Sequence, residues 1–338
     1  MANLRAGLIG LGMMGRHHGR VLAGLEGVDL VAAADAAGDP HGVAKGRPLV
    51  DSVEELLSHR LDYCVVAVPT AFHEDVALKL AAAGVHAMIE KPLAPNVAAA
   101  TRIAEAFDVA GLVGAVGHIE RFNPALQQAR RRLEQGELGK VYQVVTRRQG
   151  PYPARISDVG VVMDLATHDI DLTAWVTQQD FVQVAAHTAY QSGRQHEDLV
   201  AVTGLLADGT VTSHLVNWLT PFKERVTVIT GERGAFVADT LTADLTFHAN
   251  GIVQNTWVDV AHFRGVSEGD MIRYGFAKKE PLQLEHEALR DAVRARVDGT
   301  DVAGEAPDVV TLAQGLATVL VAEAVLTSAR TGRGMDLT

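Results

Sequence analysis

The sequence predicts an α/β protein in two parts. The N-terminal part is a doubly wound parallel sheet, and the C-terminal part is an α+β domain with a large, mainly antiparallel open sheet. Short β-branched runs alternate with helical patterns in the first third of the chain, and a glycine-rich loop follows the first run. Longer alternating runs with hairpin signals fill the second half. The pattern changes near residues 117–124, so we expect domains at 1–120 and 121–338.

The first third is expected to contain parallel strands separated by helices. The predicted strands are 4–9, 30–34, 63–68, 85–89 and 112–116, and the clearest helices are 72–83 and 96–109. A strand, a helix and a second strand in succession imply parallel pairing with a right-handed crossover. In such sheets ligands bind at the carboxyl ends of the strands, so these ends are where function is expected.

The second half is expected to contain a helix at 124–134 and then a meandering sheet. Its predicted strands are 141–147, 182–190, 199–206, 210–218, 226–230 and 235–239. Asp208-Gly209 and the sequence GERG at 231–234 are hairpin signals. Helical patterns at 282–296 and 308–329 close the chain. A cleft between two such domains is the natural place for a ligand.

Composition narrows the classes of function. With 338 residues, 48% of them hydrophobic, the chain can bury two cores. A net charge of -11 disfavours nucleic acid as a partner. No stretch of roughly 18 uninterrupted apolar residues and no signal-peptide pattern is present, which favours a cytoplasmic protein without a membrane partner. The single cysteine, Cys64, lies in an apolar run and is expected in the core.

The loop after the first strand has the pattern of a dinucleotide site. Gly10 is expected to make the tight turn, Gly12 to let the backbone approach a pyrophosphate, and Gly15 to let the next helix pack on the strand. Asp35 ends the second strand about 20 residues further on, where a carboxylate can bind the ribose hydroxyls. Asp35 would repel a 2′-phosphate, so we expect NAD rather than NADP. The loop also places two methionines beside the cofactor, Met13 and Met14.

Other candidate residues follow the fourth and fifth strands. Pro69 and Thr70 are expected to border the nicotinamide, and His73 begins a helix there as a structural or cofactor-side residue. Glu90 and Lys91 end the fifth strand at the same edge of the sheet, and both are candidates for binding the cofactor. Lys91 can stabilise negative charge on a substrate hydroxyl, although a surface ammonium explains the sequence equally well.

The stretch DLATHDIDL, 164–172, combines carboxylates and an imidazole within an apolar, helix-like run. At 100° per residue, Asp164, His168 and Asp171 fall within about 60° of one another, between apolar flanks. We therefore expect this stripe to face a cleft, with Asp169 and Thr173 on the water side. A histidine with a carboxylate one turn away suits general acid–base catalysis. A polar structural helix or a metal site explains the same residues, but no third metal ligand has an evident spacing.

The motifs GLIGLGMMGRHH, VPTAFH, EKPLA, GHIERFNP and DVGVVMDLATHDIDL, in this order, resemble the Gfo/Idh/MocA oxidoreductase family over essentially the whole chain. The resemblance implies a Rossmann domain, oxidation or reduction of sugars and cyclitols with NAD(P), and oligomers, dimers or tetramers, formed through the C-terminal sheet. It gives catalytic roles to Lys91, Asp164 and His168, without a metal, and implies a cis Lys91–Pro92 bond.

A narrower likeness is to the UDP-N-acetylglucosamine 3-dehydrogenase branch of this family. It implies oxidation of a ring hydroxyl, at C3, of an amino sugar that is nucleotide-linked or belongs to a natural-product pathway. Candidates for the anionic end of such a substrate are Arg121, Asn123, Arg155, Lys223 and Arg225. The alternatives are a cyclitol, inositol or unmodified-sugar dehydrogenase, a ketosugar reductase, a metal-assisted lyase or hydrolase, and a non-catalytic dinucleotide-binding sensor.

Overall fold

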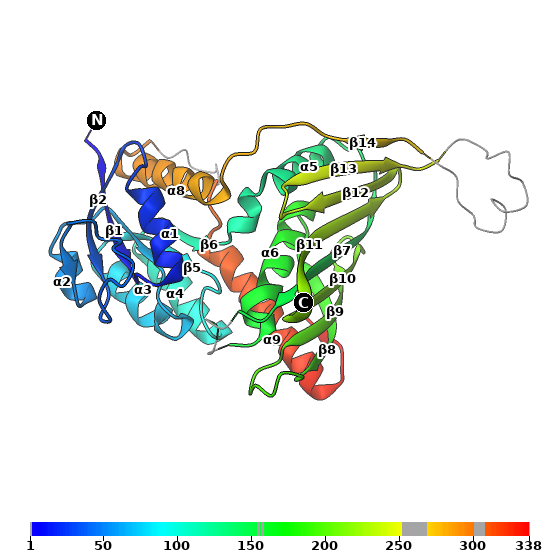
Figure 1. Cartoon of the computed structure of the whole chain (residues 1–338), viewed down its shortest axis with the longest axis horizontal. Helices are drawn as coiled ribbons and strands as arrows, with labels where there is room; N and C mark the ends of the chain where they lie inside the picture. Colours follow the sequence, from blue (N-terminus) through cyan, green and yellow to red (C-terminus); the bar gives the residue numbers. More distant parts are fainter. Residues whose placement is uncertain (1, 154–155, 157–158, 252–268, 301–307, 338) are drawn as a thin grey trace, which may run out of the picture. The chain divides into compact units, whose positions relative to one another are not determined.

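The computed structural model describes residues 2–153, 156, 159–251, 269–300 and 308–337. Within these residues the chain forms two compact units, each built on one sheet (Figure 1). Unit 1 comprises Met1–Ile119 and Glu280–Leu320. Unit 2 comprises Glu120–Lys279 and Val321–Thr338.

Unit 1 contains a six-stranded sheet with the order β3-β2-β1-β4-β5-β6, and all its strand pairs are parallel. The strands are β1 (Leu4–Ile9), β2 (Val28–Ala34), β3 (Leu49–Val50), β4 (Tyr63–Val66), β5 (His86–Glu90) and β6 (Gly114–Gly117). The sheet grows outward from β1 in both directions, which makes the edge beyond β1 and β4 the switch point for ligands. The predicted doubly wound sheet is confirmed.

The helices of unit 1 connect its strands. They are α1 (Met13–Leu22), α2 (Val53–Leu57), α3 (His73–Ala82) and α4 (Val97–Val109), with a 3₁₀ turn at Thr70–Phe72. Asn96 begins α4, and its side chain accepts a hydrogen bond from the backbone N–H of Ala99. Strand β3 and helix α2 were not predicted from the sequence, because elements this short show no measurable hydrophobic period.

The chain returns to unit 1 after its long excursion through unit 2. Helix α8 (Pro281–Val297) places Leu289 and Val293 in the same buried cluster as Leu4 and Tyr63. We expected residues 121–338 to form a single domain, and this expectation did not place α8 in unit 1. Hydrophobic periodicity shows that a helix has a buried face, but it does not show which sheet covers that face.

Unit 2 contains a nine-stranded sheet with the order β14-β13-β12-β11-β7-β10-β9-β8-β15. The strands are β7 (Val141–Pro151), β8 (Phe181–Ala189), β9 (Leu199–Leu206), β10 (Val211–Asn217), β11 (Leu219–Gly231), β12 (Gly234–Asp239), β13 (Asp244–Ala249), β14 (Met271–Arg273) and β15 (Met335–Asp336). The pair β7 and β10 is parallel, and the other pairs are antiparallel. The predicted open sheet is confirmed, and so are the hairpin turns at Asp208-Gly209 and at 231–234.

The two faces of this sheet differ. Helices α5 (Pro124–Glu134) and α6 (Thr167–Thr177) lie against one face, where Val144 and Ile229 join their buried apolar residues (Figure 1). Side chains alternate between the two faces along each strand, and those on the other face, such as Val145 and Val211, are partly or fully exposed. Among the described residues, the sheet is therefore packed on one side only.

The last helix, α9 (Leu312–Thr331), begins in unit 1 and ends in unit 2. By length and composition it is apolar enough to cross a membrane, which the search for uninterrupted apolar runs did not indicate. Its residues Val319, Ala322 and Val325 are buried inside the protein. Core helices of soluble proteins pass the same test, so α9 is weak evidence for a membrane span.

Replacing Leu289 with alanine tests the return of α8 to unit 1. Because this side chain is fully buried, we expect the variant to lower the free energy of unfolding by about 2–5 kcal/mol in urea denaturation. Val297, half exposed at the end of the same helix, is the matched control, and Val297→Ala should change stability by less than about 0.5 kcal/mol. Equal effects of the two substitutions would contradict this packing.

Candidate functional site

The glycine loop between β1 and α1 has the geometry that its sequence predicts. Gly10 has a φ of +90°, which few residues other than glycine adopt. A Cβ atom on Gly15 would lie 1.9 Å from the carbonyl oxygen of Gly10, so only glycine fits where α1 packs against the loop. A Cβ on Gly12 would meet no atom within 4 Å. The backbone at Gly12 thus leaves room for a pyrophosphate at the N-terminus of α1.

Asp35 follows β2 and bonds to two backbone groups. Its Oδ2 accepts a hydrogen bond of 2.7 Å from the N–H of Leu11, and its Oδ1 accepts one of 2.8 Å from Ala37. The first bond ties the carboxylate to the glycine loop. A carboxylate has about four acceptor positions, so both oxygens can still accept from ribose hydroxyls. The loop and Asp35 together fit a dinucleotide.

His73 connects the loops that follow β4 and β5. Its ring is buried, with Nε2 3.0 Å from the carbonyl oxygen of Val68 and Nδ1 3.0 Å from that of Pro92. Burial lowers the pKa of this histidine. The structure therefore gives His73 a bracing position between the two loops. Pro69 and Thr70 lie in the first of these loops, and they are exposed and partly exposed respectively.

Lys91 follows β5 at the carboxyl edge of the parallel sheet and is partly exposed. The bond between Lys91 and Pro92 is cis, as the family resemblance implied. Glu90 is buried, and its carboxylate bonds to the ring of His18 and to the backbone N–H of Lys91. The sequence analysis did not single out His18, although the histidine pair in GRHHGR directly after the glycine loop was a visible signal.

Asp164 and His168 lie where the helical run of unit 2 begins. Residues Val162–Ala166 form a π-helical turn, in which the N–H of Thr167 bonds to the carbonyl of Val162, and α6 follows it. The angular count assumed a regular α-helix from Asp164 onward, and that assumption is wrong for this turn. Asp164 is buried and His168 is partly exposed. π-helical turns often occur at functional sites.

The expected water side of this helix is buried. Asp169 and Thr173 are 2% and 0% exposed, so the prediction that they face water is wrong. For Asp169 the physical reason is an ion pair: the Nε of Arg148 lies 3.0 Å from Asp169, and its Nη1 lies 2.9 Å from Glu120. Burial raises the pKa of Asp169 against the attraction of Arg148.

A second buried ion pair involves Asp171. Arg121 donates two hydrogen bonds to this carboxylate, of 2.8 and 2.6 Å, and both side chains are buried. Asp171 is therefore part of a buried structural ion pair. Asn123 is also buried, where it begins α5 by accepting from the N–H of Ala125 and donates to the carbonyl of Thr240. The substrate roles predicted for Arg121 and Asn123 stay predictions.

The remaining basic candidates differ in accessibility. Lys223 is exposed on β11. Arg225 is partly buried and donates to the backbone carbonyls of Gln149 and Glu224, and burial together with Arg148 lowers its pKa. Arg155 lies outside the described residues. Over the part of the chain that the structure describes, no cluster of three His, Cys, Asp or Glu side chains is placed to hold a metal ion.

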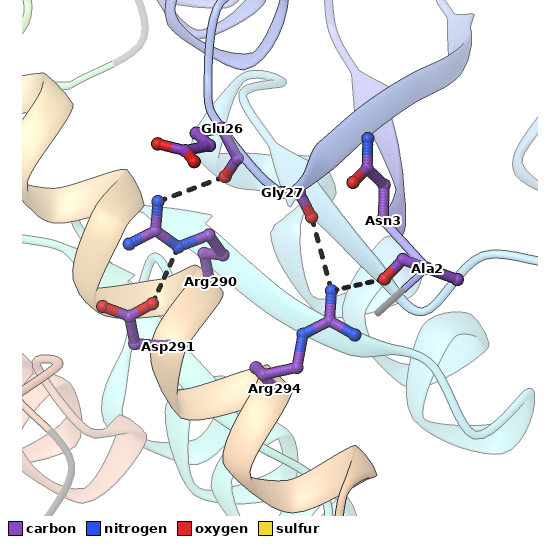
Figure 2. A pocket seen from close by; sticks show the side chains of 7 residues that line it. All are labelled: Ala2, Asn3, Glu26, Gly27, Arg290, Asp291 and Arg294. Atoms are coloured by element: carbon purple, nitrogen blue, oxygen red, sulfur yellow. Dashed lines mark hydrogen bonds and ion pairs between the residues drawn. The ribbon is translucent and has the colours of Figure 1, made fainter.

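A pocket of about 350 Å³ lies elsewhere in unit 1 (Figure 2). Arg290 and Arg294 of α8 line it and donate to the carbonyls of Glu26 and Gly27. It lies at the amino ends of β1 and β2, which begin at Leu4 and Val28. This pocket is therefore at the opposite edge of the sheet from the glycine loop, and it is not the dinucleotide site.

Comparison with known families agrees with this geometry. Residues 4–149 match a family described as "Oxidoreductase family, NAD-binding Rossmann fold", and residues 126–237 match the "GFO/IDH/MocA C-terminal domain". The chain belongs to the Gfo/Idh/MocA oxidoreductase family. Unit 1 is accordingly an NAD-binding Rossmann domain.

Curated members of the Gfo/Idh/MocA family differ in substrate. The chain is 32% identical to the UDP-N-acetylglucosamine 3-dehydrogenase of Acidithiobacillus ferrooxidans, over 63% of this chain and 66% of that protein. It is 29% identical to the scyllo-inositol 2-dehydrogenase (NAD(+)) of Bacillus subtilis, over 54% of this chain and 57% of that protein. Both matches span less than two thirds of the relative's length.

Solved structures of the family match over nearly the whole chain. The 3-dehydrogenase GnnA of Acidithiobacillus ferrooxidans has a TM-score of 0.83 at 25% identity, covering 98% of this chain and 99% of that one. The WlbA dehydrogenase of Bordetella pertussis, in complex with NADH and UDP-GlcNAcA, has a TM-score of 0.78 at 25% identity, covering 99% of each chain.

Two glycine variants separate the roles of the loop. In Gly15→Ala the new Cβ collides with Gly10, so we expect a lower thermal midpoint of the free protein and weaker NAD binding. Gly12→Ala meets no protein atom, so it should affect the midpoint far less and yet weaken NAD binding about tenfold or more. Calorimetric titration with NAD and thermal denaturation measure both. Wild-type NAD affinity in Gly12→Ala would contradict the assigned pyrophosphate position.

Proposed function

We propose that the protein oxidises a ring secondary hydroxyl of an amino sugar to a ketone with NAD. The observation that best supports this is the position of His168. Its imidazole is partly exposed and follows a π-helical turn that contains the buried Asp164. Buried ion pairs hold the helix that carries it. A dehydrogenase needs a base of this kind, because oxidation of an alcohol releases a proton from the hydroxyl as well as a hydride from carbon.

Three side chains have complementary tasks in the proposed reaction. Lys91 donates a hydrogen bond to the reacting hydroxyl and stabilises negative charge as it develops on that oxygen. His168 accepts the hydroxyl proton, and Asp164 orients the imidazole and favours its protonated form. NAD, when bound, accepts the hydride at C4 of the nicotinamide. In the reverse direction, the same residues return the proton to a ketone.

The glycine loop and Asp35 hold the cofactor in this proposal. Gly12 leaves room for the pyrophosphate, and the oxygens of Asp35 accept from the ribose. Met13 and Met14, in the first turn of α1, border the same site. The two loops braced by His73 carry Thr70 and Lys91 toward the nicotinamide end.

The choice of an amino sugar rests on the 3-dehydrogenase relative and on basic side chains of unit 2. Lys223 is exposed and therefore available to the anionic part of a nucleotide-linked substrate. Arg225 can add a second cation, since it contacts backbone carbonyls rather than a carboxylate. A cyclitol dehydrogenase is the second candidate, because the inositol relative is nearly as similar.

Alanine substitution of His168 or Lys91 tests the assignment of these roles. We expect each variant to lower the kcat for NADH formation with UDP-N-acetylglucosamine by about 10²–10⁴-fold, because the proton acceptor or the polarising cation is missing. The Kd for NAD should stay within about threefold, since neither residue belongs to the glycine loop. His59→Ala, at a partly exposed histidine that precedes β4, serves as the control with wild-type turnover. Variants that lose NAD binding but keep turnover per bound NAD would refute the assignment.

The uncovered face of the unit 2 sheet supports a second proposal, that the protein forms a homo-oligomer through it. Apolar side chains recur on this face in neighbouring strands, and Leu205 and Val211 are 37% and 47% exposed. These two residues are direct partners across β9 and β10. A broad apolar sheet face of this kind suits a symmetric contact with a second copy.

The double variant Leu205→Lys, Val211→Glu tests the proposed interface. The two new charges are opposite and adjacent, so they remain compatible with the sheet while they charge its outer face. In sedimentation experiments we expect the wild type to be an oligomer and the double variant to be a monomer. Val109 is 89% exposed on α4, so Val109→Glu should leave the oligomer intact. A monomeric wild type, or an unchanged oligomer in the double variant, would contradict the interface.

A further inference from the structure

Unit 1 contains a buried chain of ionisable side chains that ends at Lys91. The Nε2 of His18 lies 2.8 Å from Oε1 of Glu90, and its Nδ1 lies 2.9 Å from Nε2 of His286. The other carboxylate oxygen of Glu90 accepts the backbone N–H of Lys91 at 3.0 Å. Both histidines are 0% exposed and Glu90 is 8% exposed. Such a chain is costly to bury unless its members are paired.

Three separate elements supply this chain. His18 lies on α1, directly behind the glycine loop, Glu90 ends β5, and His286 lies on α8. The carboxylate lies close to β6, because a Cβ on Gly117 would approach Oε1 of Glu90 to 3.2 Å. Its hydrogen bonds to His18 and to the backbone N–H of Lys91 fix its position.

The charge states follow from the surroundings. Burial alone would raise the pKa of Glu90, but the bond from His18 and the charges of His18 and Lys91 lower it, so the group is a carboxylate. Burial and the neighbouring His18 hold the pKa of His286 well below its usual range, so this ring is neutral. Because a carboxylate only accepts hydrogen bonds, Nε2 of His18 is the donor in its contact with Glu90.

We propose that Glu90 and His18 are positioning residues for Lys91. His286 sets the orientation of the His18 ring, and His18 fixes the position of the Glu90 carboxylate. The carboxylate in turn holds the backbone of Lys91 and places a negative charge beside it. This inference rests on the proposed catalytic role of Lys91. It also links the cofactor loop to the catalytic loop, because the helix that begins at the glycine loop carries His18.

A purely structural explanation accounts less well for these side chains. Apolar residues of the same volume often fill a buried site with equal or greater stability, and they need no partners. Only an ionisable chain places a fixed negative charge beside Lys91. The chain also leaves Nδ1 of His286 without a partner among the described residues, so it is not arranged to satisfy every polar atom.

Two substitutions of His18 separate its two hydrogen bonds. The amide nitrogen of glutamine matches the Nε2 position, so His18→Gln keeps the donor to Glu90. The amide nitrogen of asparagine matches Nδ1, so His18→Asn loses the donor to Glu90 and keeps only the hydrogen bond with His286. We expect His18→Asn to lower kcat about tenfold or more and His18→Gln to stay within about threefold of wild type, because a small misplacement at a reacting group is costly.

Two further variants and a second measurement complete the test. Glu90→Gln should lower kcat as His18→Asn does, and all three variants should keep the Kd for NAD within about threefold. His86→Gln changes another buried histidine, at the opposite end of β5, and should retain wild-type kcat. Equal losses in His18→Asn and His18→Gln, or a wild-type kcat in His18→Asn, would overturn the proposal.

A readout without substrate separates this proposal from the proposed function. We expect acetic anhydride to label Lys91 at least about threefold faster in His18→Asn and Glu90→Gln, because the Glu90 carboxylate no longer holds the backbone of Lys91, with labelling measured by mass spectrometry. Lys79 and Lys278 are the internal controls and should be unchanged. If Lys91 labelling responds but no substrate is oxidised, the proposed function fails and the positioning chain stands. If wild type oxidises substrate and Lys91 labelling is unchanged, the positioning proposal fails.

Discussion

A buried charge is stable only when a partner or a set of hydrogen bonds compensates its lost hydration, and this constraint organises both units of the protein. In unit 1, Glu90 is compensated by His18 and by the backbone of Lys91. In unit 2, Arg148 and Arg121 compensate Asp169 and Asp171 on α6. In each unit the paired charges adjoin the residue to which we assign chemistry, Lys91 or His168.

The consequence is rigidity next to the proposed chemistry. Arg148 joins strand β7 to α6, and it also bonds to Glu120 at the start of unit 2. The helix that carries His168 therefore cannot rotate or slide without leaving a charge unpaired inside the protein. Rigid supporting shells of this kind keep a reacting group in place and lower the cost of reaching the transition state.

The local features of the protein were predictable from its sequence, and the pairings between distant residues were not. Glycine spacing determined the loop, because Gly10 and Gly15 meet within a few residues of each other. Parity along β7 already put Arg148 on the same face as Val144 and Thr146, which was a signal of a buried charge. Its partner Asp169 is 21 residues away on another element, however, and helix periodicity placed that residue in water.

Two other features of the structure could not be predicted from the sequence. His18 and His286 are 268 residues apart, and a single sequence contains no information that joins them. The π-helical turn at Val162–Ala166 changes the angular relation of Asp164 to His168, and the sequence does not reveal such a turn. Spacing and the family resemblance indicated the residues that we propose for catalysis, while the ion pairs that surround them required the structure.

The most direct test of the account is a substrate comparison with NAD. NADH formation should be measured with UDP-amino sugars and aminoglycoside precursors against cyclitols and unmodified sugars. We predict a kcat/KM at least about tenfold higher for an amino sugar than for any cyclitol, a preference worth about 1.4 kcal/mol. A preference for a cyclitol would contradict the amino-sugar assignment, and the absence of NADH formation with every compound would contradict the proposed dehydrogenase activity.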